Sequence, residues 1–357
     1  MPPAHPFMTE RVLSTRELNR AILARQLLLE RSRLSLTRAL ERIGGLQTQY
    51  APSAYVALWS RLHGFRRPAL TKALVERRAV QATLIRATIH IVSAGDFPFL
   101  GAGIRRGRRE WWLRVQRGQL KGIDMKAVAS RVRRHLSGGP LRQGELVDRL
   151  RADGFPQAVA AGMGMWVDLV RVPPSGTWEQ RRADLYGLAD DWLDMPNPTE
   201  AEGLEHLVRR YLGGFGPASV DDMSSWAGLQ VTTLRPAINR LRLRRFRDED
   251  GGELLDLPGA LHPDPDAPAP VRFLPTWDAT LLVHARRAQI LPEQYRPLVF
   301  NTKTPHSVST FLVDGAVAGT WRYESGRVHL DPFDRVPTVS WHELEREAKR
   351  LAAFHAT

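Results

Sequence analysis

"GPASVDDMSSWAGLQVTTLRPAINRLRLRRF", which runs from Gly216 to Phe246, decides the expected fold. Its Gly-Pro opening and polar segment are typical of a helix start, and a short helix, a glycine-containing turn and a second helix follow. The basic, β-prone end continues into "RRFRDEDGGELLDLP", where Asp250-Gly251 predicts a hairpin turn. Two helices followed by a hairpin are the sequence profile of a winged helix-turn-helix.

A second segment has the same profile. "GPLRQGELVDRLRADGFPQAVAAGMGMWVDLVRV" runs from Gly139 to Val172 and continues into a hairpin expected to turn at Ser175-Gly176. Two such segments in one chain favour a pair of winged helices. Two unrelated helical hairpins are the alternative.

The N-terminal part is predicted to be mainly helical. Ser14-x-x-Glu17 is a capping box before the amphipathic "RELNRAILARQLLLERS", and Gly44-Gly45 ends the next helix, "SLTRALERIGG". Helices are also expected at "AYVALWSRL" and "RPALTKALVERRAV". The β-branched "ATLIRATIHIVSAGDF" predicts a strand, which Asp96 ends unless it caps the next helix.

The C-terminal part changes character after a proline-rich linker, His262–Pro270. Asp314-Gly315 and Ser325-Gly326 predict hairpin turns between strands, so a small antiparallel sheet or barrel is expected here. A final helix, "SWHELEREAKRLAAF", is predicted to begin at a second capping box, Ser340-x-x-Glu343.

Composition excludes several classes of protein. The 357 residues are 43% hydrophobic and 25% charged, which are ordinary globular values and suggest two or three domains. There is no cysteine, so disulfides, thiolate nucleophiles and cysteine-held metals are excluded. The histidines are scattered and no phosphate-binding glycine loop is found, so we expect no metal and no cofactor. The lack of a secretory signal and of a long apolar run predicts a cytoplasmic protein with no membrane partner.

The charge balance points to a polyanionic partner. Lys and Arg number 51 against 38 Asp and Glu, for a net charge of +13. Nucleic acid is the first interpretation and an anionic membrane surface the second. Arginine dominates the cations, so a generally basic, arginine-rich proteome is the structural alternative.

Two glutamines follow the predicted helix end in "GGLQTQYAPSAYVALWSRL", Gly44–Leu62. Gln47 and Gln49 are two residues apart, so their side chains point the same way only if the chain is extended there. Both carboxamides could then act at one point. The alternative is that they satisfy free backbone groups at the helix end.

Six stretches in this order carry a family resemblance: "GGLQTQYAPSAYVALWSRL", "RATIHIVSAGDF", "RVPPSGTWEQRRADLYGLA", "YLGGFGPASVDDMSSWAGL", "FLPTWDATLLVHARR" and "FLVDGAVAGTWR". Over about residues 10 to 355 the chain resembles the AlkZ-like winged-helix DNA glycosylases. The family's catalytic motif is a glutamine, any residue, then glutamine or aspartate, which is Gln47-Thr48-Gln49 here. The middle residue is usually apolar, and Thr48 departs from that pattern.

The resemblance implies an α+β fold, with tandem winged helix-turn-helix domains and a C-terminal antiparallel β-domain around a concave DNA-binding cleft. We expect domains at residues 1–130, 131–200, 201–262 and 263–357. The implied activity is hydrolysis of the N-glycosidic bond of alkylated purines in double-stranded DNA, with unhooking of interstrand crosslinks in the AlkZ branch. We expect a monomer.

Glutamine suits a restricted set of substrates. An N7-alkylguanine is already cationic, so its departure needs no strong general acid, and the sugar develops oxocarbenium character as the bond breaks. A carboxamide oxygen can accept a hydrogen bond from water and present a partial negative charge. Our hypothesis is that Gln49 accepts from the attacking water while Gln47 holds that water or the sugar. No lysine lies beside the motif, so a monofunctional hydrolase is expected.

Further residues are candidates for DNA contact because they are basic, aromatic or close to family-like stretches. The alternatives are a polar strand edge for "RATIH", a solvated helix face with core tryptophans for "RRGRREWW", and a turn cap for the aspartate of "PTWD". The candidates are Arg86, Thr88, His90, Arg105, Arg106, Arg108, Arg109, Arg244, Arg245, Trp277, Asp278, His284 and Arg286.

The sequence leaves two non-catalytic functions open. Winged helices serve transcription regulators far more often than enzymes, so a sequence-specific DNA-binding protein is the main alternative. A module that binds protein partners is the other.

Overall fold

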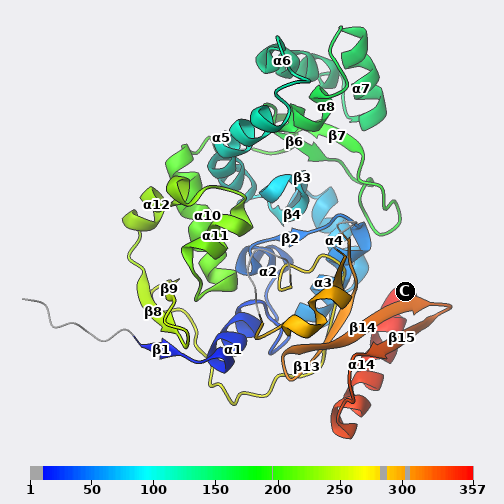
Figure 1. The fold of residues 1–357 in the computed structure, drawn as a ribbon. Coiled ribbons are helices and arrows are strands. Elements are labelled where there is room, and N and C mark those ends of the chain that lie inside the picture. The colour runs from blue at the N-terminus through cyan, green and yellow to red at the C-terminus, as the bar shows by residue number, and fades with distance from the viewer. Residues whose placement is uncertain (1–10, 195, 282–287, 302–305, 357) are drawn as a thin grey trace, which may run out of the picture.

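The computed structural model describes residues 11–194, 196–281, 288–301 and 306–356 as a mixed α+β fold (Figure 1). The two predicted helix–helix–hairpin segments lie at its top and its left, and the C-terminal sheet lies at the lower right. Among the described residues, every helix is too short or too polar to span a lipid bilayer.

The N-terminal helices follow from local capping. Helix α1 (Thr15–Arg25) begins at Ser14, which accepts from the backbone N–H of Glu17 while Glu17 accepts from Ser14, so the predicted capping box is confirmed. Helix α2 (Leu36–Ile43) ends at Gly44, whose φ of 76° is the left-handed conformation that glycine adopts without strain. Helices α3 (Ala51–Arg61) and α4 (Arg67–Val75) follow.

A six-stranded antiparallel sheet forms the centre, in the order β2-β4-β3-β6-β7-β5. These strands are β2 (Leu46–Gln47), β4 (Ile89–Ser93), β3 (Ala79–Thr83), β6 (Leu169–Arg171), β7 (Leu185–Leu188) and β5 (Leu141–Arg142). Strands from both sides of the predicted boundary at residue 130 share this sheet.

The single strand predicted across "ATLIRATIHIVSAGDF" is wrong. The segment forms β3, a 3-10 turn η1 (Ile85–Ala87) and β4, and Arg86 and Ala87 have φ values of 52° and 58°. The Leu84 N–H donates to the Thr88 carbonyl at 3.0 Å and closes the turn. The β-branched residues on both sides of the turn favour strand, so the local pattern gives no sign that the chain reverses between them.

The upper helices form a core of their own. Helix α5 (Phe97–Val115) leads from the sheet to α6 (Met125–Leu136), α7 (Gln143–Ala152), α8 (Val159–Gly162) and η2 (Met163–Met165). Strands β6 and β7 follow, so the element order predicted for Gly139–Val172 is present. The hairpin turn predicted at Ser175-Gly176 is wrong, because the connection between these antiparallel strands runs over residues 172–184. Ser175 lies inside this connection, where its Oγ donates to the Arg182 carbonyl at 2.8 Å.

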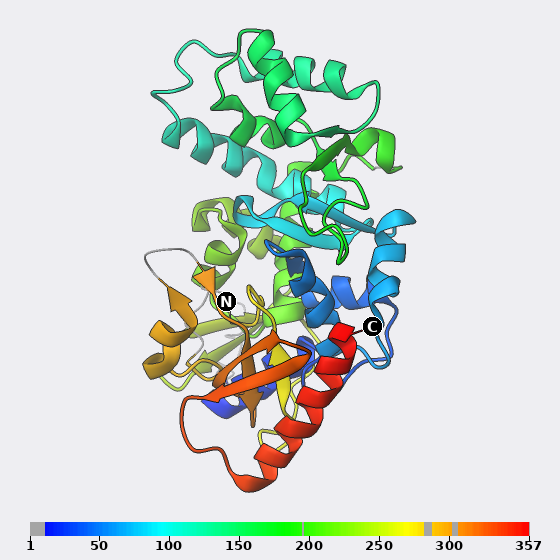
Figure 2. The same cartoon turned by 90° about the vertical axis from the view of Figure 1, so that its right-hand side faces the viewer.

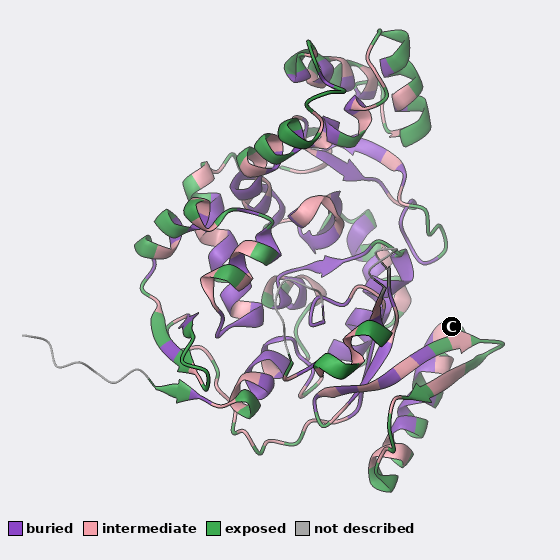
Figure 3. Ribbon diagram, viewed as in Figure 1, coloured by how far each residue is buried: buried purple, intermediate pink, exposed green. Residues whose placement is uncertain are grey.

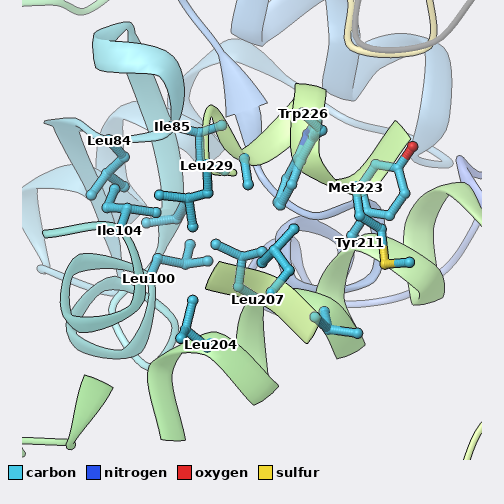
Figure 4. Close-up of a cluster of buried hydrophobic side chains, with 14 of the residues drawn as sticks. Leu84, Ile85, Leu100, Ile104, Leu204, Leu207, Tyr211, Met223, Trp226 and Leu229 are labelled. Carbon is cyan, nitrogen blue, oxygen red and sulfur yellow. The ribbon is translucent and has the colours of Figure 1, made fainter. Parts of the chain in front are cut away.

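The main core lies between α5, α10 (Glu200–Phe215) and α11 (Val220–Ala227) (Figure 4). Helices α5 and α10 approach closely at Gly103 and Gly203, where a Cβ on Gly103 would lie 2.7 Å from the Gly203 carbonyl carbon. Leu100, Leu207, Tyr211 and Trp226 fill the space around this crossing, and buried residues concentrate here and along the central sheet (Figure 3). The short helix α9 (Ala189–Trp192) connects β7 toward α10.

The other helix–helix–hairpin segment has the predicted order. Gly228 ends α11 with a φ of 66°, and α12 (Val231–Arg240), β8 (Arg244–Asp248) and β9 (Glu253–Asp256) follow. The hairpin turns at Asp250-Gly251 as expected, and β1 (Val12–Leu13) adds to β8 in parallel.

The C-terminal sheet contains β10 (Arg272–Leu274), β13 (Thr310–Val313), β14 (Ala316–Glu324) and β15 (Arg327–Pro332), all antiparallel. Both predicted turns have positive φ and are confirmed. Helix α14 (Thr338–Ala356) begins before Ser340, so the second capping box is wrong, and Glu343 instead accepts from the Val271 N–H at 3.1 Å. The remaining short elements are η3 (Glu293–Tyr295), α13 (Arg296–Val299), β11 (Phe300–Asn301) and β12 (His306–Ser307).

A buried ion pair joins α3 to the chain that follows β10. Asp278 accepts two hydrogen bonds of 2.8 Å from the Arg61 guanidinium, and neither side chain is exposed. Asp278 therefore does not line a DNA-facing surface, which corrects the prediction that it contacts DNA. Its second role is that of a turn cap, because it also accepts from the Thr280 N–H at 3.0 Å.

We expect Asp278→Asn to lower the free energy of unfolding by about 3 to 5 kcal/mol, because it leaves the buried Arg61 charge without its counter-ion. Urea unfolding followed by circular dichroism measures this loss. Asp331→Asn is the matched control, since Asp331 pairs with Arg322 at the surface and should cost under about 1 kcal/mol. Equal losses in the two variants would contradict the assignment.

Candidate active site

The glutamine motif lies between β2 and α3, beside the end of β3 and the start of β4. Gly45 approaches β4 so closely that a Cβ would lie 2.8 Å from Val92 Cγ1. Gln47 pairs with His90 in the register of β2 and β4, and the Thr48 N–H donates to the Ile89 carbonyl at 2.8 Å. The expected extended geometry is therefore found at Gln47 and Thr48, and Gln49 lies in the bend that follows.

Gln47 is buried and its amide is held by a cation. Its Oε1 accepts from Arg86 Nη2 at 2.9 Å, and the same guanidinium donates to the Trp226 carbonyl through Nη1. Burial lowers the pKa of Arg86 to about 10, so the group remains charged at neutral pH. Gln47 thus turns its oxygen toward Arg86 and directs Nε2 elsewhere.

Gln49 is exposed and is fixed by the backbone of β4. Its Oε1 accepts from the Ile89 N–H at 2.9 Å. Since a backbone N–H bonds only to an acceptor, this contact sets the amide orientation and leaves Nε2 and one oxygen lone pair for a ligand. The sequence left open the alternative that both glutamines only satisfy free backbone groups. Gln49 does bond to one such group, the Ile89 N–H, but its Nε2 and one oxygen lone pair are left for a ligand.

His90 is enclosed and neutral. Burial and, secondarily, the Arg86 charge lower its pKa to about 3. Its Nδ1 is 3.0 Å from the Thr88 carbonyl, which can only accept, so Nδ1 carries the proton. Arg86 does not share a strand face with Thr88 and His90 as predicted, because it lies in the η1 turn. Arg86 nevertheless bonds to Gln47, and His90 is the strand partner of Gln47.

The four predicted arginines of α5 have partners within the protein. Arg105 pairs with Asp168 at 2.7 Å and Arg106 with Glu200 at 2.9 Å. Arg108 is buried and donates to the Thr83 carbonyl at 3.1 Å, while Arg109 donates to the Met165 carbonyl at 2.7 Å. DNA contact by these residues remains a prediction, for which Arg106, with a side chain 61% exposed, is the most accessible.

The remaining predicted contacts are dispersed. Arg244 and Arg245 are exposed on β8, where Arg244 lies 4.9 Å from the Phe246 ring and Arg245 pairs with Glu253. Trp277 is half-buried and its backbone N–H donates to Ser307 Oγ at 2.7 Å. His284 and Arg286 lie outside the described residues. Within the described part of the chain, no cluster of three His, Asp or Glu side chains could hold a metal ion.

Two contacts of the site have no signal in the sequence. The Ile89 N–H that holds Gln49 is a backbone group, and its availability depends on where β2 ends. Arg181 donates to the Tyr50 hydroxyl at 2.8 Å from 131 residues away along the chain. Both depend on strand pairing and loop path, which local patterns do not encode.

Comparisons with known proteins place the chain in a family and a fold. The family model described as DNA glycosylase AlkZ-like matches residues 40–354. An interstrand DNA cross-link repair glycosylase from Streptomyces sahachiroi is 24% identical, over 92% of this chain and 93% of the relative. The solved structure of Streptomyces sahachiroi DNA glycosylase AlkZ matches with a TM-score of 0.78 at 18% identity, covering 96% of this chain and 97% of that one, and so shows a shared fold.

Acid should destabilise the protein through His90. Its folded pKa of about 3 lies below the ordinary value of 6.5, so between these values the unfolded chain binds the additional proton and stability falls as the pH is lowered. From pH 7 to pH 4.5, we expect His90→Gln to lose about 2 to 3 kcal/mol less unfolding free energy than the wild type. Urea unfolding at both pH values measures this.

The control is His342→Gln, a change at an exposed position of α14. It should lose as much stability on acidification as the wild type. An equal acid response in His90→Gln and the wild type would show that His90 is not held neutral.

Proposed function

This chain belongs to the AlkZ-like DNA glycosylase family, and we propose that it hydrolyses the N-glycosidic bond of cationic N7-alkylguanines in double-stranded DNA. The observation that carries the proposal is the exposed Gln49 amide, fixed on β4 beside the Gln47–Arg86 pair. We further propose that the two helix–helix–hairpin segments act as winged helices bordering a DNA-binding cleft.

The reaction needs little proton transfer from the protein. The water oxygen forms a bond to C1′ as the C1′–N9 bond breaks, and the bonding pair moves into the purine ring and cancels its positive charge. The alkylguanine leaves neutral, and the proton of the attacking water passes to solvent. A neutral His90 and two amides are compatible with this chemistry because no general acid is required.

The two glutamines have different surroundings, which supports a division of roles. The free lone pair of Gln49 Oε1 accepts from the attacking water and presents a partial negative charge to the oxocarbenium-like sugar. Gln47 Oε1 is already polarised by Arg86, so its role is to donate through Nε2 to the same water or to a sugar oxygen. Orientation by these fixed groups lowers the barrier without a full charge.

The partner in this proposal is double-stranded DNA that carries alkylated or crosslinked purines, bound by a monomer. The net charge of +13 and the exposed Arg106, Arg244 and Arg245 support binding to phosphates. The relative from Streptomyces sahachiroi is an interstrand cross-link repair glycosylase, which supports crosslink unhooking as part of the activity.

We expect Gln49→Ala to lower single-turnover release of N7-methylguanine from alkylated duplex DNA by about 100-fold, because the water loses its acceptor. Gln47→Ala should lower it less, and the double variant no more than tenfold beyond Gln49→Ala. Gln294→Ala, at an exposed glutamine of η3, is the matched control and should retain the wild-type rate. Duplex binding, followed by fluorescence anisotropy, should stay within threefold for all four variants.

Full excision by Gln49→Ala would exclude the proposed role of that residue. An inactive wild type that binds one DNA sequence preferentially would instead indicate a non-catalytic regulator.

A further inference from the structure

A pocket of about 970 Å³ lies beyond the C-terminal end of α3, away from the glutamine motif. The motif directly precedes α3, whereas His63, just after the end of the helix, belongs to the pocket lining. The 11 residues of α3 span about 16 Å, so the two ends of the helix are well separated. The described residues of the lining include none of the three motif residues.

The walls of this pocket come from several parts of the chain. Besides His63, they are the end of α1 with the connection that follows it, α2, the loop after β9 near Leu261, and Arg210 on α10. In both views α1, at the blue end of the colour bar, lies in the half of the molecule opposite to α6, α7 and α8 (Figures 1 and 2). None of the described residues of those upper helices lines the pocket.

The pocket is positively charged, and part of that charge is unpaired. We call it the arginine pocket, after Arg31, Arg33, Arg38, Arg42 and Arg210 in its lining. Two glutamates also line it, and one of them, Glu41, lies 2.9 Å from Arg38 and 3.8 Å from Arg210, so its charge is already offset. Arg33 and Arg42 are exposed, and their guanidinium groups make no hydrogen bond or ion pair with the described part of the chain. These two cations are therefore presented to an anionic ligand.

The arginine pocket also exposes apolar side chains. Leu34 and Leu261, which line it, are 44% and 54% exposed. Leu27 contributes to the same lining and has a φ of 57°, a conformation that costs free energy in a residue other than glycine. This conformation turns the chain out of α1 and into the connection that carries Arg33 and Leu34. A ligand that covers the two exposed leucines gains free energy from burying apolar surface.

The combination of unpaired arginines and exposed leucines favours an acidic peptide over nucleic acid. Duplex DNA presents mainly phosphates and sugars at its outer surface, so it would leave Leu34 and Leu261 uncovered. Proteins that bind single strands stack bases on aromatic side chains, and the described lining contains the His63 ring but no Phe, Tyr or Trp. A peptide with carboxylates beside an apolar side chain uses both features, and arginine clusters are a recurring means of recognising acidic motifs.

We propose that the arginine pocket docks a short segment of a partner protein in which Asp or Glu residues flank a side chain of the size of Leu or Phe. The carboxylates pair with Arg33 and Arg42, and the apolar side chain covers Leu34 and Leu261. This docking is separate from base excision, so the protein can hold the partner and DNA at the same time.

The first test uses a fluorescein-labelled peptide of sequence Asp-Asp-Leu-Asp-Asp-Phe-Asp-Asp-Leu-Asp, titrated with the intact protein at physiological salt and followed by fluorescence anisotropy. We expect a Kd of about 10 μM. A peptide with Asn for every Asp, and a peptide with Ser for Leu and Phe, should each bind about tenfold more weakly, because each lacks one of the two contributions. Equal binding of the Ser peptide would indicate general charge attraction and overturn the proposal.

Arg33→Ala/Arg42→Ala should weaken binding of the original peptide about tenfold. Arg335→Ala/Arg346→Ala is the matched control, because it removes the same charge from exposed positions outside the pocket lining. Charges more than about 8 Å away are largely screened at physiological salt, so the control should stay within about twofold of the wild type. Absence of binding by the wild type, or equal losses in the two double variants, would overturn the proposal.

Leu34→Ser/Leu261→Ser tests the apolar contribution. It should weaken binding of the original peptide about tenfold and leave binding of the Ser peptide unchanged, because that peptide has no side chain to cover the leucines. An equal effect on both peptides would contradict the proposed contact.

The last test separates the partner from DNA. With the protein saturated by an undamaged duplex, the peptide should bind with a Kd within about threefold of that for the free protein. Arg33→Ala/Arg42→Ala should bind the duplex as tightly as the wild type, which also shows that the variant is folded. Displacement of the peptide by the duplex, or loss of duplex affinity in this variant, would assign the pocket to DNA and overturn the proposal.

Discussion

The pairing of β2 with β4 is the interaction on which the candidate site depends. It sets His90 opposite Gln47 and leaves the Ile89 N–H available to hold Gln49. A slip of one residue would turn both glutamines to the opposite face of the sheet. The close approach of Gly45 to Val92 helps to prevent such a slip, because only glycine fits there. The geometry of the candidate site is in this sense a consequence of strand register.

Helix α3 connects this register to the rest of the molecule. Its N-terminus follows the glutamine motif directly, and its last residue, Arg61, is buried against Asp278. The same helix lines a pocket of about 450 Å³ with Pro52, Ser53 and Val56. A helix fixed at both ends holds the glutamine motif at a constant separation from the buried Arg61–Asp278 pair, which a loop of equal length could not do. Burying the Arg61 and Asp278 charges costs desolvation free energy, and the pair in return fixes the position of the C-terminal end of α3.

What the sequence could predict was local. The Ser14–Glu17 capping box, the glycine ends of α2 and α11, and the hairpin turns at Asp250, Asp314 and Ser325 depend on a few neighbouring residues, and all are confirmed. The η1 turn was missed because flanking β-branched residues hide a reversal between strands. α1 also ends at Arg25, earlier than its apolar periodicity suggests, where Leu27 takes a φ of 57°. The motif at Gln47 was found by resemblance, whereas its partners Arg86 and Ile89 depend on pairing between distant segments.

The charge of Arg86 limits what the proposed site can act on. A guanidinium that stays protonated near a cationic purine would oppose binding, since like charges at short range repel strongly where water is excluded. The Gln47 carbonyl oxygen, which accepts from Arg86, offsets part of this charge with its partial negative charge. The repulsion that remains between Arg86 and the cationic purine must be offset by an anion. A DNA phosphate flanking the lesion is an anion that every such substrate contains. An arginine beside the proposed site therefore favours lesions within a polynucleotide over free modified nucleosides, because only a polynucleotide supplies the flanking phosphate.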